Sequence, residues 1–363
     1  MSAGFSGSYA AEDVTFLLKP VTMAATGVAE KERLIQTGRR HYSEMISIEP
    51  PPDEEHLRLY REALARNGAR LAADVATLAR LLAEAVPAPR EVVLLSLARA
   101  GTPIGVLLRR ALLRQGRRAA HYSISIVRDR GIDRTALAHV ARRHAAADAV
   151  FVDGWTGKGA IAAELRASLA ACTLGFRPRL AVITDPAGRA DYAAGNDDYL
   201  IPCALLNAVG SGLVSRTILN ASVVGKGEFH ACLYYDHYTG RDLSRDFVDA
   251  VDGLAASIRP GPEGPAVEPD GARTRCDAFI AALLATEGLK DANLVKPGIA
   301  ESTRALLRRV PMKLFVRDPA DPDVHHLLRL ARLKRVGLAS LPASAPFRAV
   351  VLIRSLGAKE RAA

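Results

Sequence analysis

The segment Ala149–Ile161, AVFVDGWTGKGAI, decides the fold of this chain. It begins with four apolar residues, as a buried parallel strand does, then reaches Asp153 and three glycines at positions 154, 157 and 159. Residues 160–172 follow with good helix formers at helical spacing. Glycines let backbone N–H groups approach an anion, and a helix N-terminus carries partial positive charge. The order strand, acid, glycine turn and helix therefore predicts a phosphate site.

Two common phosphate motifs do not fit this turn. A P-loop requires Ser or Thr after Gly-Lys, whereas Gly159 follows Gly157 and Lys158 here. A dinucleotide fingerprint requires G-x-G-x-x-G, and the three glycines have a different spacing. Neither a nucleotide-triphosphatase loop nor a dinucleotide fold is therefore predicted.

Alternating apolar and helical segments surround this motif. Strands are expected at residues 92–97, 121–126, 149–152 and 179–184, with helices at 53–86, 102–113 and 135–146, the first bent or broken at Gly68. This order predicts an α/β fold, a parallel sheet with helices on both faces. Ligands of such sheets bind at the carboxyl ends of the strands, so Arg99, Arg128, Asp153 and Asp185 should meet at one edge.

Bulk composition narrows the class of protein. A chain of 363 residues suggests two domains at about 100–200 residues each, and the net charge of +10 favours anionic partners. The four cysteines form no C-x-x-C pair, so reduced thiols and a cytoplasmic location are expected. No signal peptide is expected, and no apolar run approaches the about 18 residues of a membrane span.

Proline, glycine and acid mark the division of the chain. Residues 260–271, PGPEGPAVEPDG, are typical of a linker. We therefore predict a first domain at 1–258, a linker at 259–273 and a second domain at 274–363. Residues 1–50, which end at three prolines, are interpreted as a hood over the substrate.

The motif and its neighbours resemble type I phosphoribosyltransferases, which use phosphoribosyl diphosphate (PRPP). Asp153 stands at the first acid of the PRPP signature, Gly154 replaces the usual second acid, and residues 156–160 match the 5′-phosphate loop. Residues 96–103 resemble the diphosphate-binding loop of that family. Residues 127–133 resemble its mobile flap, which would exclude water from the reacting sugar.

This resemblance implies transfer of a phosphoribosyl group from PRPP to an unknown base-like acceptor. The implied catalytic residues are Asp153, which would hold the ribose hydroxyls, and the lid residues Arg128 and Arg130. The implied substrate-binding residues are Arg99, Ala100, Gly101, Thr156, Gly157, Lys158, Gly159, Asp185, Ser211 and Arg216. The implied cofactor is Mg²⁺, held by substrate and water with no metal ligand assigned to the protein. Because Gly154 replaces an acid, a non-catalytic RNA-binding protein that senses PRPP or a nucleotide is an alternative.

Residues 5–250 and 290–355 narrow the resemblance. They are similar to the phosphoribosyltransferase-like proteins of bacterial tellurite-resistance (Ter) stress operons, a family labelled "cysteine protease StiP". That label offers another alternative, a cysteine protease with Cys203 or Cys232 as nucleophile and His230 or His237 as base. Cys203 lies in an apolar run and Cys232 in an alternating strand, patterns that favour buried, inert thiols.

The C-terminal segment resembles the Pelota-type RNA-binding domain. From Lys290 to Arg361 there are 15 Lys and Arg against 6 Asp and Glu, a net charge of +9. Such a charge favours contact with a phosphate backbone. The resemblance implies RNA contacts around a glycine turn and the helix after it, by Lys296, Gly298, Glu301, Arg304 and Arg308. Ala300 stands where related RNA binders have Asn. The sequence is compatible with a homodimer and names neither the RNA nor the acceptor.

Overall fold

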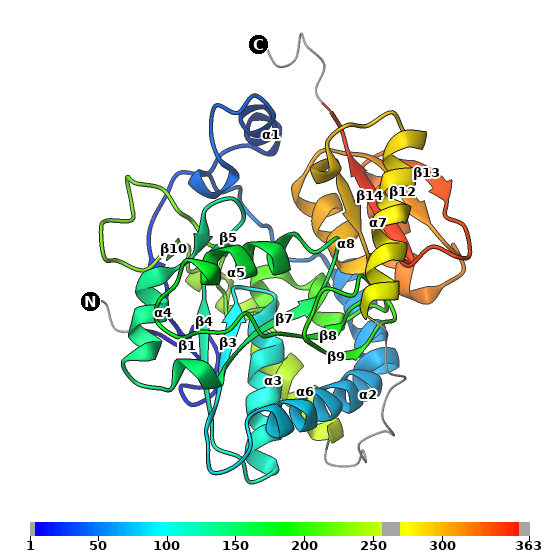
Figure 1. The fold of residues 1–363 in the computed structure, drawn as a ribbon. Helices are drawn as coiled ribbons and strands as arrows, with labels where there is room; N and C mark the ends of the chain where they lie inside the picture. The colour runs from blue at the N-terminus through cyan, green and yellow to red at the C-terminus, as the bar shows by residue number, and fades with distance from the viewer. Residues whose placement is uncertain (1–3, 256–268, 356–363) are drawn as a thin grey trace.

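The computed structural model describes residues 4–255 and 269–355, called here the N-terminal and C-terminal units. Figure 1 shows the C-terminal unit, coloured yellow to red, packed on one side of the N-terminal unit. Most of the predicted linker lies outside the described residues, and helix α7 (Pro269–Thr286) includes its last five positions. Within the described residues, no helix is long and apolar enough to cross a membrane.

A six-stranded sheet forms the centre of the N-terminal unit. Its order is β1-β4-β3-β7-β8-β9, and every neighbouring pair is parallel. The strands are β1 (Thr15–Phe16), β4 (Ala119–Ile124), β3 (Val92–Leu97), β7 (Ala149–Trp155), β8 (Leu180–Thr184) and β9 (Tyr192–Gly195). The predicted α/β class is confirmed, and β3 has the bounds that its apolar run predicts.

Helices cover both faces of this sheet because the central strands are apolar on both sides (Figure 1). Leu94 and Val150 face the layer of α2 (Glu54–Ala85), α3 (Gly101–Arg114) and α6 (Ser244–Ala255). Leu95 and Phe151 face α4 (Arg134–Ala141) and α5 (Ala160–Ala170). The one-residue alternation thus divides each strand between two hydrophobic cores.

Two helices differ from their predicted bounds. Helix α2 runs unbroken through Gly68, where the absent side chain leaves room for α6; an added Cβ would lie 3.1 Å from the Leu254 Cδ1 atom. Helix α4 ends at Ala141, five residues early, and a 3-10 turn, η2 (Ala146–Asp148), leads into β7. Tertiary packing keeps α2 helical at Gly68, and the turn into β7 ends α4 early. Both effects override the helix preference of the local sequence.

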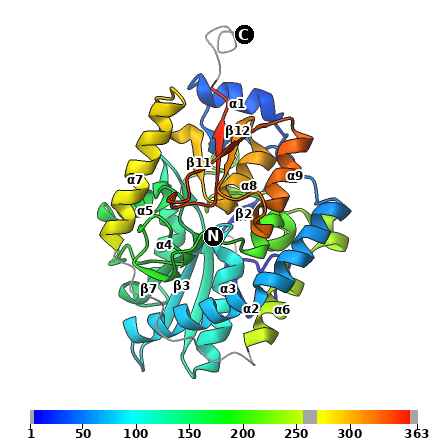
Figure 2. The same cartoon turned by 90° about the vertical axis from the view of Figure 1, so that its right-hand side faces the viewer.

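The first 50 residues, the predicted hood, hold several short elements. Besides β1, these are β2 (Lys19–Pro20), which pairs with β10 (Ala231–Cys232), helix α1 (Val28–Gln36) and the 3-10 turn η1 (Tyr42–Glu44). Helix α1 reaches the C-terminal unit, since Arg309 Nε donates to Glu32 at 2.6 Å. Figure 2 shows α1 at the same end of the molecule as the C-terminal sheet.

The C-terminal unit is a small α/β layer structure. Its sheet has the order β11-β14-β12-β13, formed by β11 (Val295–Pro297), β14 (Ala349–Ile353), β12 (Pro311–Val316) and β13 (Gly337–Ser340). Helices α8 (Ile299–Arg308) and α9 (His325–Leu333) share a core with β14 on one face, and α7 packs on the other. Helix α8 lies against the N-terminal unit, which brings its basic side chains to the carboxyl ends of the parallel strands.

Candidate functional site

A cleft of about 850 Å³ opens where the hood, the carboxyl ends of the parallel strands and α8 meet. We call it the interdomain cleft. It is lined by many of the predicted site residues: Arg128, Arg130, Asp153, Thr156, Gly157, Lys158, Gly159, Arg216, Lys296, Glu301, Arg304 and Arg308. The residues expected to bind substrate and several of those expected to bind RNA therefore face the same cavity.

The glycine turn after β7 forms the floor of the cleft. Gly159 has φ +91° and a Cβ there would lie 2.8 Å from the Arg189 side chain, so only glycine fits without strain. Gly157 lets the C-terminal unit come close, because its Cβ would lie 3.4 Å from Glu301 Cγ. The predicted glycine turn is thus present, and it is covered by α8.

Asp185 supports this turn from behind instead of facing a ligand. It is 5% exposed, and its carboxylate accepts hydrogen bonds from the Thr156 hydroxyl and from the backbone N–H groups of Arg189 (2.9 Å) and Ala190 (2.7 Å). Its acceptor sites are therefore used within the protein. The structure gives it a positioning role, in contrast to the predicted contact with substrate.

Asp153 faces the cleft from the end of β7. It accepts a hydrogen bond from the Gly154 N–H at 2.8 Å. Burial raises the pKa of Asp153 to about 6, although the charge of Arg304 opposes this shift. A carboxyl with this pKa exchanges protons near neutral pH, so Asp153 is suited to either a hydrogen-bonding or an acid–base role.

The predicted flap is the hairpin of β5 (Ile126–Val127) and β6 (Gly131–Ile132). From it Arg128 Nη1 donates to Asn293 Oδ1 at 3.1 Å, and Arg130 pairs with Glu44 at 2.8 Å. Arg216 donates to the carbonyl oxygens of Tyr42, at 2.7 Å, and Met45. These contacts tie flap, hood and C-terminal unit together around the cleft.

Basic residues from both units meet in the cleft. The Lys158 ammonium donates to the carbonyl oxygens of Ala292 and Val295, the second at 3.3 Å. Arg304 lies 4.5 Å from the centre of the Trp155 ring and pairs with Glu301 at 3.0 Å. Helix α8 thus brings Arg304 to the N-terminal unit, and Lys158 of the glycine turn reaches the C-terminal unit.

Gly298 begins α8 with φ +91°. The helix N-terminus already binds an anionic group, because Ile299 N–H donates to Asp198 Oδ1 at 3.0 Å. Asp198 belongs to the N-terminal unit and is buried, and burial raises its pKa to about 6. The turn expected to contact RNA is therefore occupied by a carboxylate of the same chain.

Arg99 does not reach the interdomain cleft. It is 6% exposed, its Nη2 pairs with Glu49 at 2.6 Å, and its Nη1 donates to the Val214 carbonyl at 2.9 Å. Arg308 also pairs with Glu49, at 3.4 Å. Because the charge of Arg99 is neutralised inside the protein, it is not available for the predicted contact with diphosphate.

The other residues of that predicted loop lie beside Arg99. Ala100 and Ser211 line a small second pocket with it, and that pocket shares Trp155, Arg304 and Arg308 with the cleft. Gly101 instead packs against β7, where an added Cβ would lie 2.1 Å from the Val152 carbonyl oxygen. Close helix–strand packing, and not ligand binding, requires glycine there.

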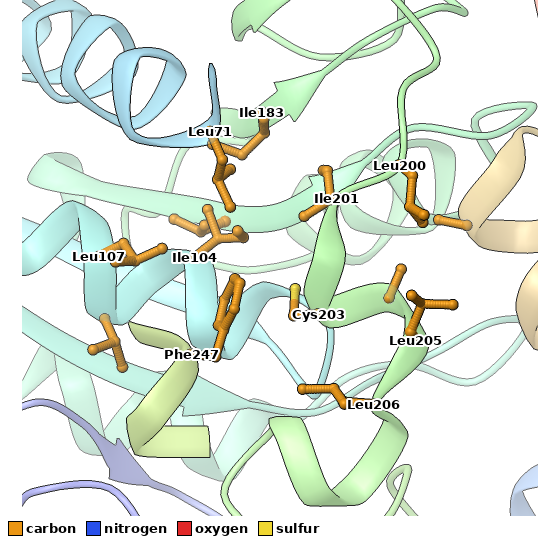
Figure 3. Close-up of a cluster of buried hydrophobic side chains, with 14 of the residues drawn as sticks. Leu71, Ile104, Leu107, Ile183, Leu200, Ile201, Cys203, Leu205, Leu206 and Phe247 are labelled. Atoms are coloured by element: carbon orange, nitrogen blue, oxygen red, sulfur yellow. The ribbon is translucent and has the colours of Figure 1, made fainter. Parts of the chain in front are cut away.

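The candidate thiols are buried. Cys203 lies on the 3-10 turn η3 (Pro202–Leu205) among apolar side chains that include Ile104 and Phe247 (Figure 3). Its side chain also borders the small second pocket. Burial raises the pKa of Cys203 to about 12, against the opposing charge of Arg304. At neutral pH this thiol therefore keeps its proton in the structure.

Cys232 is fully buried in β10, and burial raises its pKa to about 12. His230, one of the two expected bases, bonds through Nδ1 to the Ser125 hydroxyl at 2.8 Å, and the other, His237, is exposed beside Asp236. Within residues 4–255 and 269–355, neither thiol is hydrogen-bonded to an imidazole. The expected nucleophile–base pair is not assembled in this arrangement.

Four residues of the site have no signal in the sequence. Lys31 of α1 and Arg309, which directly follows α8, line the cleft but lie in segments that look like ordinary charged surface. Glu49 pairs with Arg99 and Arg308, and Trp155 lines both the cleft and the small pocket. Among the described residues, no group of three or more His, Cys, Asp or Glu is placed to hold a metal ion, and the expected Mg²⁺ stays a prediction.

Comparison with known proteins assigns the family. A family described as "tellurite-like stress resistance cysteine protease StiP" matches residues 7–252, and the PELOTA RNA binding domain matches residues 274–355. A curated protein of Acinetobacter baylyi named "Cysteine protease StiP" is 40% identical over 370 residues, covering 98% of this chain and 96% of that protein.

A solved hypoxanthine phosphoribosyltransferase from Trypanosoma cruzi, complexed with IMP, is 16% identical and covers 52% of this chain and 92% of its own, with a TM-score of 0.28. That score is too low to carry an argument. The prediction of a PRPP-dependent phosphoribosyltransferase is therefore wrong, because the family and the full-length relative both carry the name of the alternative, a cysteine protease. The chain belongs to the StiP family of tellurite-like stress resistance proteins, and its residues 274–355 match the PELOTA RNA binding domain.

Proposed function

We propose that this chain is a stress-resistance protease that uses Cys203 as its nucleophile. The observation that carries the proposal is the 40% identity, over 98% of the chain, to a protein named as a cysteine protease. Of the three buried thiols, Cys203 is favoured because its side chain borders a pocket, whereas Cys232 and Cys276 are 0% exposed.

The chemistry requires the Cys203 thiol to lose its proton. The thiolate would attack a peptide carbonyl, the C–N bond would break as the amine takes up a proton, and water would hydrolyse the thioester. Burial opposes this first step here, whereas the charge of Arg304 favours it. Opening of the small pocket, with entry of water and of a base, is therefore part of the proposed reaction.

Proteolysis by the full-length protein tests this proposal. Labelled casein and a mixed peptide library would be incubated under reducing conditions with wild type, Cys203→Ala and Cys276→Ala. We expect Cys203→Ala to lose cleavage and Cys276→Ala, a buried thiol of α7, to keep it. Full activity of Cys203→Ala would assign the reaction to another residue and contradict the proposal.

Labelling by a thiol-directed probe gives a second measurement. Cys172 is partly exposed and would react first, so the probe is applied in a Cys172→Ser background. We expect slow labelling of Cys203 that speeds up when substrate peptide is present. Faster labelling of Cys232 than of Cys203 would favour Cys232 as the nucleophile and contradict the proposal.

RNA binding by the C-terminal unit is a second proposed function. The match of residues 274–355 to the PELOTA RNA binding domain and the net charge of +9 over residues 290–361 support it. Because Asp198 covers the start of α8, exposed cations such as Arg332 and Arg335 are the first candidates for contact. Replacing both with Ala should weaken RNA binding and flatten its salt dependence, measured by fluorescence anisotropy. Unchanged affinity and salt slope would contradict this surface.

A further inference from the structure

Two lysines of the interdomain cleft have no hydrogen-bond or ion-pair partner among the described residues. Lys31 on α1 is 6% exposed, and Lys296 on β11 is half-buried. Within residues 4–255 and 269–355, neither ammonium group makes a hydrogen bond or an ion pair, although both side chains line the cleft. Other buried cations of this region are paired, as Arg309 is with Glu32 at 2.6 Å.

The surroundings of both lysines are positively charged. Burial lowers the pKa of Lys31 to about 8, and the charges of Arg216, Arg308 and Arg309 lower it further. Burial also lowers the pKa of Lys296 to about 7, together with Arg309 and Lys158. The charge of Arg309 acts on both lysines, and both line the same cleft.

The nearby acids do not compensate for this charge. Glu49 favours the charged form of Lys31 but is already paired with Arg99 and Arg308. Glu301 favours the charged form of Lys296 but is paired with Arg304. Both ammonium groups therefore reach the cleft without an acid of their own, so an anion bound from solution is the simplest completion of this site.

The cleft as a whole has the same imbalance. Among the described residues that line it, eleven are Lys or Arg and five are Asp or Glu, an excess of six positive charges. Its volume of about 850 Å³ is that of a small-molecule site. Both lysines line this cleft between the hood and the C-terminal unit, which suits a compact ligand better than a nucleic acid strand.

We propose that the interdomain cleft binds a small anion with two or more phosphate-type charges, held by Lys31 from the hood and Lys296 from the C-terminal unit. Phosphate oxygens accept several hydrogen bonds from ammonium and guanidinium groups at once. Such a ligand would bridge α1 and β11 and stabilise the contact of the two units. Lys31 and Lys296 line the cleft and not the adjoining pocket that Cys203 borders, so binding does not require the proposed protease chemistry.

Isothermal titration of the full-length protein tests this site. The probes are inorganic diphosphate and adenosine diphosphate, which separate a free diphosphate from a diphosphate ester. We expect at least one probe to bind, with affinity that falls as salt increases. Lys31→Met and Lys296→Met should each weaken binding by about tenfold or more. Lys226→Met, at an exposed lysine outside the cleft, is the matched control and should bind as wild type does.

Thermal unfolding of the same proteins without ligand separates a binding role from a structural one. Because Lys31 forms no ion pair within the part of the chain that the structure describes, Lys31→Met should have a melting temperature equal to or above that of wild type. Added probe should raise the melting temperature of wild type and of Cys203→Ala, but not that of Lys31→Met.

Several results would overturn the proposal. They are absence of binding by both probes at millimolar concentration, wild-type affinity of Lys31→Met, or a clearly lower melting temperature for Lys31→Met. The last result would mean that the ammonium group already has a stabilising partner within the protein.

Discussion

Glu49 is the charged residue whose loss should most disturb the contact between the two units. It is 6% exposed and lies between Arg99 of the N-terminal unit, at 2.6 Å, and Arg308 of the C-terminal unit, at 3.4 Å. The substitution Glu49→Gln keeps the shape of the side chain and removes its charge. Two buried guanidinium groups would then have no carboxylate between them.

The pKa of Glu49 gives the size of the stability loss expected for Glu49→Gln. Burial by itself would raise this pKa, but the charges of Arg308 and Arg99 lower it from 4.5 to about 2. A shift of one pKa unit corresponds to about 1.36 kcal/mol, so the lowering of the Glu49 pKa corresponds to about 3 kcal/mol of stability at neutral pH. Breaking a buried ion pair typically costs a similar amount, about 3–5 kcal/mol. We therefore expect Glu49→Gln to lower the free energy of unfolding by about 3 kcal/mol.

The sign of the pH dependence follows from the same pKa. The folded value lies below the unfolded value, so the stabilisation is complete above about pH 4.5 and is lost as the pH falls toward about 2. The difference between wild type and Glu49→Gln should therefore be largest at neutral pH and shrink to less than half near about pH 3.

Urea unfolding with two probes measures this difference. The single tryptophan, Trp155, stacks with Arg304 between the two units, so its fluorescence reports on their contact, and circular dichroism reports on the whole fold. The control is Glu228→Gln, which removes an exposed pair with Lys19 and should have no measurable effect. Wild-type stability of Glu49→Gln, or a difference that does not change with pH, would refute the reasoning.

Two further predictions concern the hydrophobic cores. Gly105→Ala should lower the free energy of unfolding by about 1–3 kcal/mol, because the new Cβ would lie 2.1 Å from Ser96 Oγ and 2.2 Å from His121 Nε2. Thermal unfolding measures this loss. The control is Gly27→Ala, whose new Cβ would have no atom within 4 Å. His326 bonds to Thr303 at 2.7 Å, and burial lowers its pKa from 6.5 to about 3, so the unfolded chain binds this proton more tightly. Stability should therefore fall as the pH drops below about 6.5. Melting curves between about pH 7 and 4 should show a weaker dependence of stability on pH for His326→Asn than for wild type. An unchanged pH dependence would assign the acid sensitivity to other groups.

Much of the fold could be predicted from local patterns. The apolar run at 92–97 is a strand with the predicted bounds, and the glycine turn after Asp153 starts a helix as expected. These features depend on neighbouring residues, because strand and helix periods, and the positive φ of Gly159, are properties of a short segment.

The predicted site residues were only partly brought together, because contacts between distant segments decide what each side chain can bind. Arg99 was expected to meet diphosphate, but Glu49, 50 residues earlier, neutralises it. Asp185 was expected at the same edge, but it bonds to Thr156 and the following turn. No local sequence pattern predicts such pairs of distant side chains.

The sequence by itself determined the α/β class, the glycine turn and the basic C-terminal segment, since each follows from spacing or composition. Only the tertiary structure decided that Asp198 covers the start of α8, that Cys203 keeps its proton, and that Lys31 and Lys296 share one cleft. The physical reason is that burial and charge pairing are set by residues that the fold brings together from positions far apart in the chain.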